Sequence, residues 1–278
     1  SLFDGLNRGV SDVMFNLREP PVEELYGAQN KFVADRVQLV GVDDASLGVV
    51  GRWPWPRGVH ARYLNRLQRF SPLTVHFDVA LIHPQAVPDI FKRQFSKQPD
   101  VLSSVTQAYQ EMDLSLAREM KKKPNVLIDL FLVRSDRPNL GYIDRVRKTE
   151  EVLQKYSYKT NLMEQGRSDE VTYWSMEPIL DIYQTNAQPV SVNTPADEDD
   201  VLRTFPLVHT YSTTADPKTG GRQARHMTSV VLASLMKLYH VPHDSVDITR
   251  NAIVLKSAKV PVLDRNRHQP IVKSMPTK

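Results

Sequence analysis

Two apolar segments, separated by a loop and a basic helical stretch, constrain the fold of this chain most strongly. The first, VQLVGV at 37–42, is followed by Asp43 and Asp44, and the second, LTVHFDVAL at 73–81, contains Asp78. The pattern predicts two strands joined by a helical crossover, which within one sheet is almost always right-handed. The acids would then lie toward the carboxyl ends of neighbouring parallel strands, where open α/β sheets usually bind their ligands.

The rest of the chain alternates strand-length apolar runs with helical patterns. The continuous apolar run NVLIDLFLV at 125–133 is typical of a strand that is covered on both faces. Helices are predicted at 107–122, near 145–156, at 177–184 and at 224–240, and strands at 189–193, 201–211, 252–256, 259–263 and 270–273. The alternation predicts an α/β fold, with a mixed, centrally parallel β-sheet flanked by helices.

One domain spanning 1–278 is predicted, with two surface insertions. The polar segments 83–106 and 134–170 contain few periodic apolar positions and are assigned to these insertions. Residues 2–17 place apolar side chains at spacings of three and four, which predicts an N-terminal helix. That helix either docks on its own core or serves as a stalk, through which a homodimer could form.

Charge and composition exclude several classes of protein. The 36 basic and 32 acidic residues give a net charge of only +4, without the basic stripe that nucleic-acid binders carry. The absence of cysteine excludes disulfides and thiolate chemistry, and it suits a bacterial periplasm, although cytosolic proteins without cysteine are also common. No apolar run approaches the ~20 residues that span a bilayer.

The acids at the predicted strand ends raise the possibility of metal-dependent phosphoryl chemistry. The phosphatase pattern needs two aspartates separated by one residue, whereas Asp43 and Asp44 are adjacent and would point to opposite faces of a strand. A metal-dependent phosphatase-like enzyme using Asp43 and Asp78 is therefore kept only as the alternative function. The sequence contains no zinc-protease motif, nucleophile elbow, phosphate loop or dinucleotide fingerprint, so we predict no catalytic residue, metal or cofactor.

The loop at 51–57 carries two tryptophans stiffened by prolines and flanked by arginines. Arg52 and Arg57 supply donors suited to a carboxylate or phosphate, with Trp53 and Trp55 between them. One interpretation is a ligand-binding lip. The other is a structural plug over the sheet end, with Arg57 paired to an acid of the preceding segment, Asp43 or Asp44.

These motifs resemble the type-two CHASE family, which comprises extracellular sensory domains associated with cyclases and histidine kinases. The resemblance rests on Asp43, Asp44, Ser46 and Leu47, then Gly51 and Trp53-Pro54-Trp55-Pro56-Arg57, then Phe77 and Asp78, and later Arg203-Thr204-Phe205-Pro206-Leu207. It covers most of the chain. Asp200 stands where the family usually has glycine.

The resemblance implies a non-enzymatic sensor on the periplasmic side of the bacterial inner membrane, between membrane helices that precede Ser1 and follow Lys278. A small-molecule ligand or periplasmic protein would act on a cytoplasmic output module, such as a histidine kinase or nucleotide cyclase. The family offers no catalytic residues to carry over. The candidate ligand-binding or structural residues are Asp43, Asp44, Ser46, Arg52, Trp53, Trp55, Arg57, His60, Asp78 and Arg203.

Overall fold

The structure is a computed structural model, which describes residues 37–134, 143–159, 172–194, 200, 202, 204–214, 218–249, 252–263 and 270–274. The chain divides into two compact units, Ser1–Trp55 with Ala196–Thr204 and Pro56–Pro195 with Phe205–Lys278. The predicted helix at 2–17 lies outside the described residues. The single domain predicted for 1–278 stays a prediction.

In the first unit, the strand predicted at 37–42 is wrong. Residues 37–43 have no regular secondary structure, and the helix α4 (Asp44–Val50) follows them. The strand was predicted on the assumption that the apolar side chains are buried, but Leu39 is 95% exposed and Val37 is 70% exposed. Without a neighbouring strand, an apolar run gains neither ladder hydrogen bonds nor cross-strand packing.

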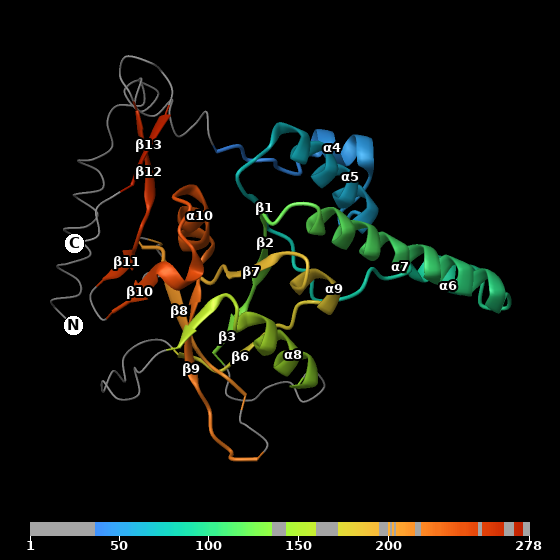
Figure 1. The fold of residues 1–278 in the computed structure, drawn as a ribbon. Coiled ribbons are helices and arrows are strands. Elements are labelled where there is room, and N and C mark those ends of the chain that lie inside the picture. The colour runs from blue at the N-terminus through green and yellow to red at the C-terminus, as the bar shows by residue number, and fades with distance from the viewer. Residues whose placement is uncertain are drawn as a thin grey trace. The chain divides into compact units, whose positions relative to one another are not determined.

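The second unit contains a parallel sheet, as predicted. Its strands β1 (Val75–Phe77), β2 (Val126–Leu130) and β7 (Gln188–Ser191) lie in the order β1-β2-β7, and both pairs are parallel. All five residues of β2 are buried, as expected for a central strand that is covered on both faces. The predicted α/β class, with a centrally parallel sheet flanked by helices, is confirmed (Figure 1).

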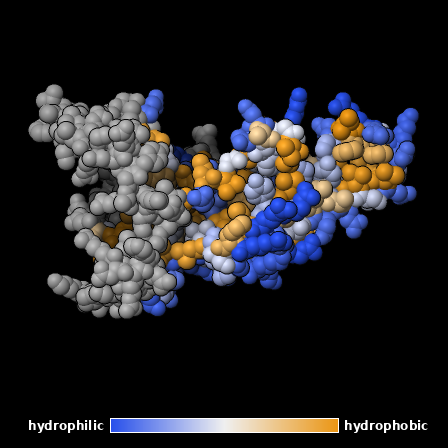
Figure 2. All heavy atoms as spheres, turned by 90° about the horizontal axis from the view of Figure 1, so that it is seen from above, coloured by the Kyte–Doolittle hydropathy of each residue, from blue (hydrophilic) through white to orange (hydrophobic). Residues whose placement is uncertain are grey.

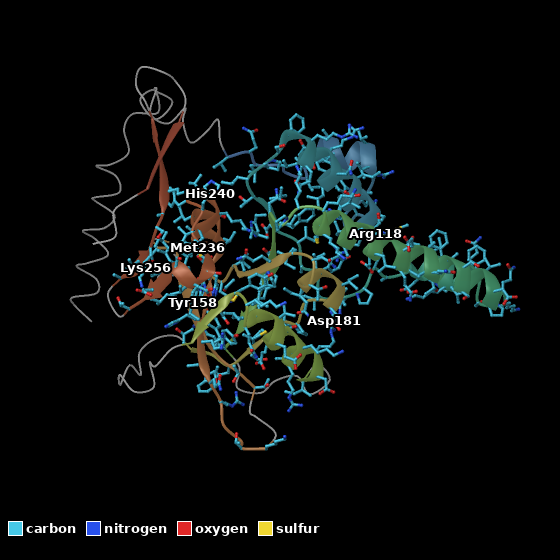
Figure 3. All side chains as sticks on the ribbon, in the orientation of Figure 1. Arg118, Tyr158, Asp181, Met236, His240 and Lys256 are labelled. Carbon is cyan, nitrogen blue, oxygen red and sulfur yellow. The ribbon has the colours of Figure 1, made fainter. Side chains whose placement is uncertain are left out.

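Helices cover both faces of this sheet. On one face, α5 (Arg57–Leu67), α7 (Pro99–Lys121) and α9 (Asp181–Gln184) share the main core with β1 and β2. On the other, α10 (Val230–Leu238) packs Ala233 on Leu127 and Val190. In Figure 3, the labelled residues Arg118 on α7 and Met236 on α10 mark the two helical layers, which lie on opposite sides of the sheet.

A second, mixed sheet has the order β4-β9-β8-β5, formed by β4 (Ser157–Lys159), β9 (Ala224–Thr228), β8 (Val208–Ser212) and β5 (Thr172–Tyr173). The helix predicted at 224–240 is therefore wrong in its first part, which is β9. β9 lies between two partner strands, and its buried side chains include the polar Arg225, His226 and Thr228, so the run lacks the apolar–polar alternation that marks a half-exposed strand. Ser229 then caps α10 by accepting a hydrogen bond from the backbone N–H of Leu232.

Three two-stranded sheets are also present among the described residues. They are β3 (Leu132–Val133) with β6 (Ser175–Met176), β10 (Val246–Ile248) with β11 (Ile253–Leu255), and β12 (Lys259–Leu263) with β13 (Pro270–Ser274). All three pairs are antiparallel. The predicted strands at 259–263 and 270–273 do pair as a hairpin, whereas β10 was not anticipated.

The predicted insertions contain more structure than their polarity suggested. The helix α6 (Asp89–Gln94) and the first turns of α7 lie within 83–106, and α8 (Ile143–Leu153) buries Val146 and Leu153. Figure 2 shows apolar residues in orange at the end of the molecule where α6 and α7 lie. Ile90 (65% exposed) and Val101 (39% exposed) are the exposed apolar residues of these turns.

Candidate functional site

The first candidate residues, Asp43, Asp44 and Ser46, begin the helix α4 and do not end a strand. Asp43 is the N-cap, and its Oδ1 accepts hydrogen bonds from the Ser46 backbone N–H (2.8 Å) and hydroxyl (2.6 Å). These two hydrogen bonds lower the pKa of Asp43. Asp44 lies in the first helical turn, where a carboxylate interacts favourably with the helix dipole. This arrangement explains the acids as helix-starting residues.

The tryptophan loop presents one ring and buries the other. The Trp55 ring N–H donates to the Gly51 carbonyl oxygen at 2.8 Å, which closes the loop, and the side chain is only 5% exposed. Trp53 packs edge-on against Trp55, with ring centroids 5.8 Å apart, and is 45% exposed. Arg52 is exposed. Trp53 and Arg52 are therefore the loop residues that a ligand could contact.

Arg57 belongs to a buried polar network in the second unit. Its backbone N–H donates to the Gln85 side chain (2.8 Å), and its Nη2 donates to the Ala80 carbonyl oxygen (3.2 Å). Its Nε lies 3.8 Å from Asp113 Oδ1. The sequence suggested Asp43 or Asp44 as the partner of Arg57, whereas the ion pair in the structure is with Asp113. The interpretation of Arg57 as a structural residue is therefore retained with a different partner.

Asp113 completes this network, which the sequence reasoning missed as a site. Its Oδ1 accepts from the Tyr183 hydroxyl (2.6 Å), and its Oδ2 accepts from the Gln85 backbone N–H (2.7 Å). Burial, and then the hydrogen bond to Asp113 and its charge, raise the pKa of Tyr183 far above its usual range. A signal was present, because Asp113 shares the helical spacing of Leu116, Ala117 and Met120, the buried face of α7.

His60 is a core residue of α5. The side chain is 8% exposed, and its ring lies edge-on to Phe77 of β1 with centroids 6.1 Å apart. This position holds α5 against the sheet. The sequence offered no reason to distinguish it from a ligand-binding histidine.

Asp78 follows β1 and is exposed, and a second acid that the sequence reasoning did not select lies beside it. This acid, Asp129 in β2, is 2% exposed, and its Oδ1 lies 2.6 Å from Nε2 of His76. Burial raises the pKa of Asp129, the hydrogen bond to His76 lowers it, and the neighbouring Asp78 carboxyl raises it. The phosphatase alternative required Asp43 at a strand end beside Asp78. Asp43 instead caps the helix α4, so the strand-end position that this alternative assumed is absent.

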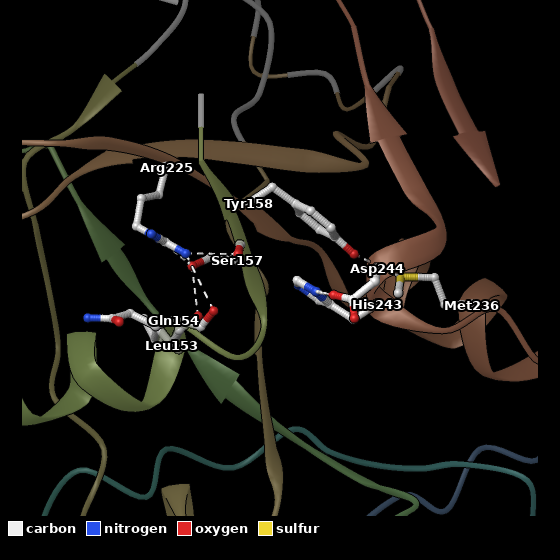
Figure 4. Close-up of polar contacts among 8 residues, drawn as sticks. All are labelled: Leu153, Gln154, Ser157, Tyr158, Arg225, Met236, His243 and Asp244. Carbon is white, nitrogen blue, oxygen red and sulfur yellow. Dashed lines mark hydrogen bonds and ion pairs between the residues drawn. The ribbon is translucent and has the colours of Figure 1, made fainter. Parts of the chain in front are cut away.

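A buried arginine in the second sheet is also fully engaged (Figure 4). Arg225 of β9 donates through Nε to the Ser157 hydroxyl (2.7 Å) and through Nη2 to the Ser157 carbonyl oxygen (2.9 Å). On the opposite side of β4, the Tyr158 ring stacks on His243 with centroids 4.2 Å apart. Burial, and then the charge of Asp244, raise the pKa of Tyr158 to about 12. These contacts hold the edge strand β4 against β9 and His243, and they do not form an open site.

The remaining candidate, Arg203, lies outside the described residues. Within the described part of the chain, no group of three or more His, Asp or Glu residues is arranged to hold a metal ion. No helix in that part is both long and apolar enough to cross a membrane.

Comparison with known families gives one match. The family model described as the CHASE2 domain matches residues 1–273 of the 278. Neither the curated proteins nor the solved structures contain a match to this chain.

Proposed function

The chain belongs to the CHASE2 family of sensory extracellular domains, and on that premise we propose that it is the periplasmic sensor of a bacterial transmembrane receptor. A small molecule or a periplasmic protein binds the domain and biases a cytoplasmic output module, such as a histidine kinase or a nucleotide cyclase. The observation that carries the proposal is the family match over nearly the whole chain. The domain itself senses and does not catalyse.

A sensor of this kind works by differential binding. A ligand shifts the receptor only if it binds two arrangements of the domain with different affinities. A shift from 1:99 to 99:1 requires about a 10⁴-fold difference in affinity, or roughly 5.5 kcal/mol. Contacts that exist in only one arrangement must supply this difference.

Within this role, the loop Gly51–Arg57 divides into anchors and contact residues. Trp55 is buried and donates a hydrogen bond to the Gly51 carbonyl oxygen. Arg57 donates a hydrogen bond to the Ala80 carbonyl oxygen and forms an ion pair with Asp113. Arg52 and Trp53 are exposed, and they combine a guanidinium with an aromatic face, a pairing that is frequent in binding hot spots. We assign signal contact to these two side chains. Self-association through 2–17 stays a prediction.

Because residues 1–278 contain no cysteine, a cysteine introduced among them is the one thiol of this domain, and labelling it in the full-length receptor tests the proposal. Lys97→Cys places a thiol on an exposed turn, and Ala117→Cys places one on the buried face of α7. In spheroplasts, a membrane-impermeant maleimide should label Cys at position 97 and leave position 117 unlabelled. Labelling at position 97 only after lysis would overturn the periplasmic assignment.

The same receptor tests the contact residues. Trp53→Ala should weaken the response of kinase or cyclase output to the periplasmic signal by about tenfold, the loss expected from a hot-spot aromatic residue. The matched control is Phe70→Ala, which removes an aromatic ring that is 84% exposed outside the loop. An equal response in both variants would remove the loop from signal contact, and the periplasmic assignment would be unaffected.

A further inference from the structure

Asp129 is a buried acid that lacks the partners its burial calls for. It lies in the central strand β2 and is 2% exposed. Its Oδ1 meets His76 Nε2 at 2.6 Å, but among the described residues its buried Oδ2 has no hydrogen-bond partner. An ionised carboxylate accepts several hydrogen bonds, and leaving one buried oxygen without any costs about 1–3 kcal/mol.

The strand register brings a second carboxyl group to this position. Phe77 pairs with Ile128 in the parallel ladder. The residues that follow them in the chain, Asp78 and Asp129, therefore lie side by side. His76 and Asp78 are two residues apart and therefore lie on the same face of extended backbone. Burial raises the pKa of Asp129, His76 lowers it, and the adjoining Asp78 carboxyl raises it. Two neighbouring carboxyl groups can hydrogen-bond to each other only through a proton.

Other charged groups around Asp129 do not neutralise this pair. The neighbouring strand β7, Gln188–Ser191, contains no ionisable side chain. On α10, which packs against the same face of the sheet, Lys237 is the only ionisable residue, and its Nζ donates to the Pro124 carbonyl oxygen at 2.9 Å. Burial lowers the pKa of Lys237. Among the described residues of β1, β7 and α10, His76 is thus the one basic side chain that contacts Asp129.

We propose that Asp78 and Asp129 form a proton-binding site, in which one proton taken from solvent bridges the two carboxyl groups while His76 holds the other oxygen of Asp129. In the protonated form, an O–H···O bond joins the end of β1 to β2. When the proton leaves, the two carboxylates repel and this end of β1 separates from β2. The edge strand β1 has only three paired residues, so the repulsion acts on a short ladder.

The separation of His76 and Asp129 does not fit a metal ion held by both side chains. Two ligand atoms on one zinc ion, each about 2.1 Å from it, are about 3 Å or more apart. Nε2 of His76 and Oδ1 of Asp129 are 2.6 Å apart, which is the separation of a short hydrogen bond. The inference also goes beyond the receptor proposal, because the proton equilibrium is a property of the purified chain.

Carboxyl-carbon NMR titration of the purified chain, labelled at aspartate, tests the site. Asp129 should titrate at higher pH than aspartate in a short peptide. Asp78→Asn removes the exposed member of the pair and should move the Asp129 midpoint to lower pH. His76→Gln should move it to higher pH, because the hydrogen bond from the imidazole, which lowers the pKa of Asp129, is replaced by a weaker one from an amide. The matched control Asp89→Asn removes an exposed acid on α6 and should leave the midpoint in place.

Hydrogen exchange of the β1 and β2 backbone amides tests the structural response. Corrected for intrinsic rates, protection should fall in the wild-type chain as the proton leaves, and should not change over the same pH range in Asp78→Asn. An Asp129 midpoint that is insensitive to Asp78→Asn would overturn the shared proton. A coupled titration with unchanged protection would overturn the separation of β1 from β2. Neither result would bear on whether the chain is a periplasmic sensor.

Discussion

Two buried aspartates differ in the partners that their carboxylates have. Asp113 lies on α7, which covers one face of the parallel sheet, and Asp129 of β2 points to the other face. Asp113 lies 3.8 Å from the Arg57 guanidinium, and it accepts hydrogen bonds from the Tyr183 hydroxyl and the Gln85 backbone N–H. Asp129 has one histidine partner, and its second oxygen has no hydrogen-bond partner among the described residues. Both side chains are nearly inaccessible to solvent, with 4% and 2% of their surface exposed.

The difference indicates two uses of a buried carboxylate. A fully hydrogen-bonded charge fixes one arrangement of its surroundings, because any movement leaves a buried group without a partner. Asp113 in this way joins α7 to the start of α5 and to α9. An incompletely satisfied charge instead favours the neutral form, so its surroundings respond to proton concentration. Asp129 is placed for that response.

Removal of the Asp113 side chain should produce the largest loss of stability. Asp113→Ala leaves the Arg57 guanidinium and the Tyr183 hydroxyl buried beside an empty position. Breaking a buried charged pair by removing one partner typically costs about 3–5 kcal/mol. The Arg57 side chain is 13% exposed, so we expect a loss near the lower end of that range, about 3 kcal/mol. Urea unfolding of the purified chain measures it.

Asp113→Asn removes the negative charge of the side chain but keeps its shape, and urea unfolding measures the effect of that change alone. The amide oxygen can still accept from Tyr183, but the attraction to Arg57 is lost, so the loss of stability should be smaller than for Asp113→Ala. Losses of equal size would mean that the ion pair with Arg57, and not the complete network, stabilises this region. A negligible loss in both variants would refute the comparison drawn between the two aspartates.

The sequence predicted the parallel sheet because buried strands have a strong signal. The run at 125–133 is apolar apart from Asn125 and Asp129, and it became β2 and β3. The histidine and the acid on either side of Phe77 did not prevent the prediction of β1. The run at 37–42 carries the same local signal without forming a strand. Apolar composition indicates that burial is possible, but pairing depends on distant residues that a local pattern does not include.

The surroundings of the candidate acids were harder to predict than the sheet, for a related reason. Asp43 and Asp78 were selected because acids after apolar runs are conspicuous, whereas Asp113 and Asp129 lie inside a helix and a strand. An acid within an apolar run, such as Asp129 in VLIDL, is itself a signal of a buried polar contact. Its partners could not be named from the sequence, because the register of β1 against β2 decides them.

Tyr183→Phe should have an intermediate effect on the Asp113 network. It removes the hydroxyl that donates to Asp113 Oδ1 and keeps the buried ring. A hydrogen bond to a charged acceptor contributes about 1.5–3 kcal/mol, and because Arg57 remains as a partner we expect a loss near 1.5 kcal/mol in urea unfolding. Tyr173→Phe, a matched change at a tyrosine that is 4% exposed outside this network, serves as the control. An equal loss in the control would assign the effect to generic loss of a hydroxyl.

Asp129→Asn should have the smallest effect and the opposite sign. The amide keeps an acceptor for His76 Nε2 and adds a donor toward Asp78, so at neutral pH we expect a gain of roughly 0.5–1 kcal/mol. The pKa of Asp129 is raised in the folded chain. Its contribution to stability is therefore full below the unfolded-state pKa and is lost as pH rises through the folded-state pKa.

The asparagine variant has no such proton to lose, so its advantage over the wild type should be present at neutral pH and should shrink as pH falls. Urea midpoints measured at several pH values between roughly 7 and 4 follow this convergence. A destabilisation at neutral pH comparable to that of Asp113→Asn would show that the Asp129 charge is required by the fold. The two buried aspartates would then have the same structural role, and the distinction between a fixed charge and a responsive one would be lost.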